Sequence, residues 1–177
     1  MHIFIMSSYN VMKWFSHPTK MVKGAMLNLE KAAINQIVSE LLLRSGSSAA
    51  VTIETYFPGG RLIGGKYSLN AHCITMYTEV IKQQCQQLFG SSERVYDYFK
   101  VVLAHELGHA ADVYLASLSR ELDLADDVQG RQIALRIEEN AWENGLKWIE
   151  DIEPGFINII LEQSLAAYRQ DVQYESA

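Results

Sequence analysis

The chain of 177 residues contains only two cysteines, Cys73 and Cys85, and their spacing fits neither a CxxC zinc pattern nor a CxxC redox pattern. We therefore expect free, partly buried thiols in a reducing compartment rather than a disulfide. No apolar run approaches the roughly 18 residues that span a bilayer. The N-terminal stretch also lacks the cationic start, long hydrophobic centre and small-residue cleavage site of a signal peptide. These absences predict a cytoplasmic protein that is neither secreted nor inserted in a membrane.

Basic clusters are missing as well. The formal net charge is -6, and no stretch of the chain is rich in Lys and Arg. Because binding to nucleic acid or to an anionic membrane requires a basic surface, neither is expected as a partner. The chain does contain 49% hydrophobic and 20% charged residues. That composition supplies enough apolar material for the core of one compact domain, which we expect to span residues 1–177.

The first half of the chain is predicted to contain a helix and a small sheet. Apolar residues recur every three or four positions over about 25–43, which is typical of an amphipathic helix, and a Ser-Gly-Ser-Ser run ends it. β-branched and aromatic residues predict a strand over 50–57, followed by a Pro-Gly-Gly turn and a second short strand over 61–65. Alternation over 72–79 predicts a third strand, which continues into a helix over 80–89.

The second half of the chain has helical periodicity throughout. It predicts three helices, over about 93–119, 128–152 and 155–173. Residues 1–24 show no clear period, and we expect them to form a lead-in segment of unassigned role. The order of a helix, a small sheet and then a helical half predicts an α+β fold with a small antiparallel or mixed sheet, rather than a parallel βαβ sheet.

The helix predicted over 93–119 contains an HExxH motif, from His105 to His109. Residues four apart on an α-helix lie on one face with Cβ atoms about 5–6 Å apart, so both imidazoles can bind one Zn²⁺ ion. Glu106 is offset from this pair and is placed to take a proton from a metal-bound water. Two imidazoles and a carboxylate buried side by side without a metal would be costly. The motif therefore favours a metal site over a core helix whose histidines only form hydrogen bonds.

A catalytic zinc site needs a third protein ligand and one open position for water. No His or Cys follows His109, so the third ligand is either an earlier histidine or a carboxylate further along the chain. The earlier histidines are His2, His17 and His72. The carboxylates lie on the helix predicted over 128–152 and are Glu138, Glu139 and Glu143.

Helical phase favours Glu138. This residue shares a face with three small residues, Ala134, Ala141 and Gly145. A helix that approaches the HExxH helix closely requires such small residues at the contact. Glu139 lies on a different face, so we prefer Glu138 as the third ligand. We expect Glu143 either at the surface or in contact with the ligands without binding the metal.

The HExxH motif followed by Glu138-x-x-Ala141 resembles the gluzincin clan of zinc metallopeptidases, and in particular the ImmA/IrrE family of metallo-endopeptidases of bacteria and their mobile elements. The match covers roughly residues 95–150, and Trp142 stands where that family commonly has Asn. The resemblance implies a zincin-like fold with an active-site helix, a glutamate helix and a small sheet whose edge strand aligns the substrate. In this chain that edge would be 72–79 or 51–57.

These roles predict a zinc-dependent metallo-endopeptidase that acts on a protein or peptide. Zinc held by His105, His109 and Glu138 lowers the pKa of its water, and Glu106 accepts the proton as that water attacks a peptide carbonyl. A second group that stabilises the developing oxyanion is normally useful.

Three residues are candidates for that second group. We choose Tyr168, on the helix predicted over 155–173, and His72 and Tyr77 are the alternatives. Asp112, one turn after His109, is a candidate for orienting a metal-binding imidazole without binding the metal itself.

Two other functions compete with the peptidase. One is a regulatory or binding module in which zinc holds helices together, and the other is a mobile-element interaction protein with a degenerate site. Glu106 favours the enzyme, because a structural zinc site normally closes with a fourth protein ligand and has no use for a free carboxylate. In so short a chain, specificity has to come from the strands, from the loop over 58–65, from the N-terminal segment or from a regulatory partner protein.

Overall fold

The computed structural model describes residues 31–173, which fold into six α-helices, one 3₁₀ helix and three strands. The predicted α+β class is confirmed, and the sheet is mixed. In chain order the elements are α1 (Lys31–Ser45), β1 (Ala50–Glu54), β2 (Gly65–Ser68), β3 (Cys73–Tyr77), α2 (Thr78–Phe89), α3 (Val95–Ala111), α4 (Leu115–Leu124), α5 (Asp127–Gly145), the 3₁₀ helix η2 (Leu146–Trp148) and α6 (Pro154–Gln173). The start of the helix expected over 25–43 and the lead-in 1–24 lie outside the described residues.

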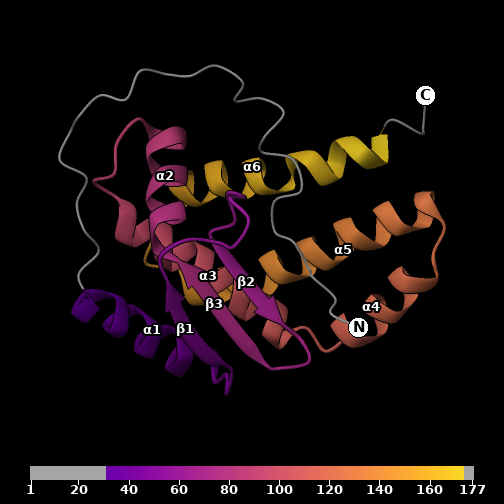
Figure 1. Ribbon diagram of the computed structural model, residues 1–177, viewed down its shortest axis with the longest axis horizontal. Coiled ribbons are helices and arrows are strands. Elements are labelled where there is room, and N and C mark those ends of the chain that lie inside the picture. Colours follow the sequence, from indigo (N-terminus) through magenta and orange to yellow (C-terminus); the bar gives the residue numbers. More distant parts are fainter. Residues whose placement is uncertain (1–30, 174–177) are drawn as a thin grey trace.

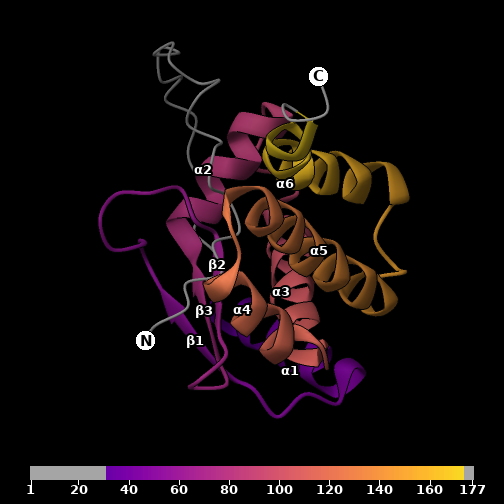
Figure 2. The ribbon, with the colours of Figure 1, turned by 90° about the vertical axis from the view of Figure 1, so that its right-hand side faces the viewer.

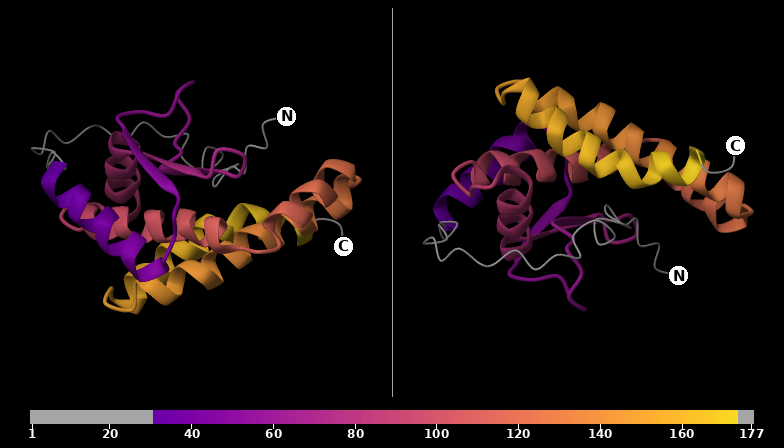
Figure 3. Two further views of the ribbon diagram at one scale, coloured as in Figure 1. Left: turned by 90° about the horizontal axis from the view of Figure 1, so that it is seen from below. Right: turned by 90° about the horizontal axis from the view of Figure 1, so that it is seen from above.

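The helix α3 lies at the centre of the fold. The sheet covers one side of it and the pair α5 and α6 covers the other, while α1 and α2 flank it (Figures 1, 2 and 3). A helix that is apolar around most of its circumference is stable only when it is buried on all sides. From Leu103 to His109 every residue of α3 is buried. The HExxH motif is therefore part of the interior.

The three strands are arranged in the order β1, β3, β2. β3 pairs in parallel with β1 and antiparallel with β2. The expectation that 72–79 forms the edge of the sheet is wrong, because β3 uses its backbone hydrogen bonds on both sides. The edges of the described sheet are β1 and β2.

The second predicted strand is shifted along the chain. A strand was expected over 61–65, whereas β2 begins at Gly65 and runs to Ser68. Residues 61–64 form a turn-like connection in which the Ile63 N–H donates to the Arg61 carbonyl. Gly65 thus begins the strand instead of ending it, and Gly64 directly precedes it.

The single helix expected over 93–119 is two helices in the structure. α3 ends at Ala111, and α4 begins at Leu115. Asp112 adopts an extended conformation, and its carboxylate accepts a hydrogen bond from the Tyr114 N–H at 2.8 Å. An Asp side chain that binds a nearby backbone N–H in this way competes with helix continuation.

Two further boundaries differ from the prediction. The strand expected over 50–57 ends at Glu54. The helix expected over 128–152 ends at Gly145 and continues only as η2.

Cys73 and Cys85 are free, as predicted, and burial raises the pKa of the Cys85 thiol to about 11. None of the helices within 31–173 combines the length and apolar character that crossing a bilayer requires.

Candidate metal centre

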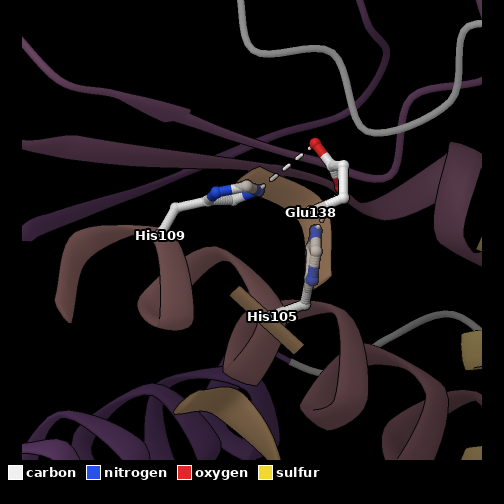
Figure 4. A group of neighbouring side chains, drawn as sticks. All are labelled: His105, His109 and Glu138. Carbon is white, nitrogen blue, oxygen red and sulfur yellow. Dashed lines mark ion pairs between the residues drawn. The ribbon is translucent and has the colours of Figure 1, made fainter. Parts of the chain in front are cut away.

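His105 and His109 lie on one face of α3, as the spacing of the motif predicts. Their ring centroids are 4.7 Å apart, and both side chains are almost fully enclosed, at 2% and 1% exposure. Figure 4 shows the two imidazoles extending from neighbouring turns of the same helix toward the carboxylate of Glu138. The local helix alone therefore sets the position of two of the three side chains.

Glu138 reaches the histidines because the backbones of α5 and α3 are in van der Waals contact. A Cβ atom on Gly108 would lie 1.9 Å from the carbonyl oxygen of Ala141, and one on Gly145 would lie 2.6 Å from that of Ala104. These two contacts also show that the helices run antiparallel. The close approach predicted from small residues around Glu138 is thus observed. We call the four residues at these contacts, Ala104, Gly108, Ala141 and Gly145, the glycine seam.

The distances between the three side chains suit a shared metal ion. Glu138 Oε2 lies 3.2 Å from His105 Nε2, and Glu138 Oε1 lies 3.7 Å from His109 Nε2. One nitrogen or oxygen atom from each residue lies within 4.8 Å of the other two. Two ligands bound tetrahedrally at about 2.1 Å from an ion are separated by about 3.4 Å. The group can therefore hold a metal ion, and nitrogen with carboxylate oxygen is a donor set that zinc accepts.

Hydrogen bonding supports the same conclusion. None of the four ring nitrogens of His105 and His109 has a hydrogen-bond partner within residues 31–173, and Glu138 Oε2 has none either. The 3.2 Å contact between Glu138 Oε2 and His105 Nε2 lacks the alignment of a hydrogen bond, and it is an ion pair only when the imidazole is protonated. Buried polar atoms are normally paired, because an unpaired one costs about 1–3 kcal/mol. A metal ion would satisfy several of these atoms together.

The protonation states of two of the three groups favour metal binding. Burial alone would lower the pKa of His105, but the neighbouring Glu138 raises it above its usual value. Burial lowers the pKa of His109 to about 4, so its imidazole is neutral at neutral pH. Burial alone would raise the pKa of Glu138, but the two neighbouring histidines and a hydrogen bond from Tyr168 hold it below its usual range. A neutral imidazole and an ionised carboxylate are the forms that bind metals.

Glu106 lies beside the three-residue group without belonging to it. Its carboxylate is buried, accepts a hydrogen bond from the Tyr67 backbone N–H, and has a pKa raised to about 7 by burial. A Cβ atom on Gly65 would lie 2.8 Å from Glu106 Cγ and Oε1. β2 therefore packs directly on Glu106, a contact that sequence analysis missed. The pair Gly64-Gly65 was its only signal.

The other predicted site residues have different environments. The Tyr168 hydroxyl reaches the centre and donates to Glu138. His72 instead binds the Tyr67 hydroxyl at 2.8 Å and contacts Ser48 at 3.3 Å, and the Tyr77 ring packs edge-on against Phe57. His2 and His17 lie outside the described residues.

Three acidic side chains weighed for this site play no direct part in the group. Asp112 accepts from Tyr114 and from Asn140 Nδ2, at 3.0 Å, and not from an imidazole. Glu139 and Glu143 are exposed on α5.

Comparisons with protein-family models, with curated proteins and with solved structures find no match to this chain.

Replacing Glu138 by alanine is expected to weaken zinc binding by about 100-fold or more. Loss of a group that only orients a ligand typically costs 10–100-fold in metal affinity, and loss of a ligand costs more. Glu139→Ala removes the neighbouring, exposed carboxylate and is expected to bind zinc as the wild type does. Competition titration of zinc against a chromophoric chelator measures both variants, with circular dichroism to verify folding. Equal zinc affinity of the two variants would exclude Glu138 as a ligand.

Proposed function

We propose that this chain is a zinc-dependent metallo-endopeptidase in which His105, His109 and Glu138 hold the metal and Glu106 is the general base. The observation that carries the proposal is the buried carboxylate of Glu106, next to the candidate metal centre and outside its ligand group. Its Oε1 atom has no hydrogen-bond partner within residues 31–173. Keeping such a group buried costs stability, and buried groups with shifted pKa values cluster at functional sites.

The task that fits Glu106 is proton transfer. When bound, zinc supplies Lewis-acid chemistry that makes water nucleophilic at neutral pH and stabilises negative charge on a carbonyl oxygen. Glu106 takes the proton from the attacking water and passes it to the leaving amine. The Tyr67 N–H fixes the carboxylate for this transfer, and Gly65 leaves room beside it.

Tyr168 is the group that we propose for hydrogen bonding to the carbonyl oxygen of the substrate. Its hydroxyl already donates to Glu138, so it lies within reach of the centre. A phenol hydroxyl has one proton to donate, so it would exchange its bond to Glu138 for one to the substrate carbonyl as negative charge develops there.

The edge strand β2 is the element that we propose for aligning the substrate. The Tyr77 N–H donates to the Gly64 carbonyl at 2.8 Å, so Gly64 faces β3. The backbone groups of Gly65 and Tyr67 then point the other way by the alternation of an antiparallel pair, and the Tyr67 N–H indeed meets Glu106. An extended peptide added to this edge would run past Glu106.

Metal depletion tests this function. The purified chain, loaded with one equivalent of zinc, is expected to cleave an unstructured protein such as casein. Treatment with a chelator should abolish cleavage, and returned zinc should restore it, because the proposed reaction depends on water activated by the metal. Mass spectrometry of the fragments measures the cleavage. Cleavage that persists after zinc has been removed would contradict the proposal.

A further inference from the structure

A small cavity of about 60 Å³ adjoins the candidate metal centre on the side of His105. Its wall combines residues from five elements or their ends, among them Gly65, Gln84, Val102, His105, Trp142 and Ser164. His105 belongs both to the metal group and to the cavity wall, whereas His109, Glu106 and Glu138 do not line the cavity, so a group that fills it lies on the His105 side of the candidate metal centre. The cavity is separate from the residues assigned above to proton transfer.

One wall of the cavity is held rigidly by an aromatic contact and a hydrogen bond. The Trp142 ring lies against the His105 ring, with centroids 4.7 Å apart and planes tilted by 36°. Its indole N–H donates to Ser164 Oγ at 3.1 Å. The hydrogen bond connects α5 to α6, so moving the indole to admit a larger group would break it.

Another part of the wall is also closely packed. A Cβ atom on Gly65 would lie 3.0 Å from Val102 Cγ1, so strand and helix are already at contact distance. Gln84 Nε2 donates to the Leu62 carbonyl at 2.9 Å, which holds that amide in place. The cavity is therefore preformed, and the contact between Val102 and Gly65 limits its size.

Size and polarity define what the cavity can accept. A volume of 60 Å³ holds a few water molecules, and hence a side chain of one to about three non-hydrogen atoms. No Asp, Glu, Lys or Arg is among the described residues that line it. A charged group would lose its hydration there without gaining a counter-ion.

We infer that this cavity is the specificity pocket of the site, and that it selects a small uncharged side chain, of the size of alanine, serine, cysteine or valine, beside the cleaved bond. The inference rests on the proposed function. It defines the substrate as a peptide with a small residue at the position that faces His105.

Binding of thiol ligands tests the pocket without relying on catalysis. Two mercaptopropanoyl-glycine compounds, one carrying a methyl and one a benzyl group next to the thiol arm, bind zinc through sulfur and present the substituent to the cavity. Calorimetry on the zinc-loaded chain should show the methyl compound binding at least about 10-fold more tightly, because the rigid walls exclude the larger group. In Val102→Ala the preference should fall at least about fivefold through tighter binding of the benzyl compound.

Val113→Ala is the matched control, since Val113 is 83% exposed on the link between α3 and α4. It should retain the wild-type ratio. Equal or tighter binding of the benzyl compound to the wild type overturns the inference, as does failure of both thiols to bind the zinc-loaded chain. The wild-type ratio decides the question even if Val102→Ala does not fold. Methyl selectivity without any peptide hydrolysis would support the pocket while contradicting the proposed function.

Discussion

Glu106→Gln is expected to keep one zinc bound per chain while peptide hydrolysis slows by about 1,000-fold. General acid–base catalysis typically contributes 10²–10⁴-fold, and glutamine is isosteric with glutamate but cannot accept the proton. The side chain does not belong to the group formed by His105, His109 and Glu138, so the metal should not be lost with it. Zinc analysis and the initial rate of fragment formation, measured on the same preparation, separate the two effects.

Glu143→Gln is the control for this experiment. Glu143 is exposed on α5, and the substitution makes the same chemical change. It should retain both zinc and rate. If Glu106→Gln hydrolysed peptide at the wild-type rate with zinc bound, the carboxylate would have no part in the chemistry. A biological effect that survived the substitution would favour the regulatory zinc module instead.

Gly108→Ala is expected to have the largest effect on folding, a loss of about 3 kcal/mol or more in the free energy of unfolding. Overpacking usually costs 1–3 kcal/mol, and here the added methyl would lie 1.9 Å from a backbone oxygen that cannot rotate away. α3 and α5 would have to separate along their whole contact. Urea denaturation followed by circular dichroism measures the change.

The same substitution at Gly130 should increase the free energy of unfolding instead of lowering it. Gly130 lies within α5, and a Cβ atom there would meet only Leu122 Cδ1, at an ordinary 3.7 Å. Replacing a helical glycine by alanine at an open position stabilises a protein by roughly 0.5–1 kcal/mol. If both variants were stabilised, helix propensity would dominate at both positions, and the importance assigned to the seam would be wrong.

The metal group could be predicted because its geometry is mostly local. Helical periodicity alone places His105 and His109 on one face. The third member comes from another helix, yet the small residues around Glu138 encode the contact that brings it there. Chemistry and packing therefore pointed to the same residue.

The contribution of β2 to the site could not be predicted in this way. Strand order depends on pairing between distant segments, and the alternation over 72–79 fits a central strand as well as an edge. The pair Gly64-Gly65 looks like a turn, because a glycine needed for close approach has the same sequence signature as a glycine needed for a bend. The break at Asp112 was missed because a single polar side chain decided it.

The glycine seam has a consequence for how the protein acquires its metal. Two backbone contacts, Gly108 with Ala141 and Ala104 with Gly145, fix both the spacing of the helices and their register. The conformational entropy of gathering the donors is thus lost during folding and not when the ion arrives. An incoming cation meets donors that are already assembled, so the metal-free chain should present the same backbone as the loaded one, and ions of similar radius should exchange without refolding.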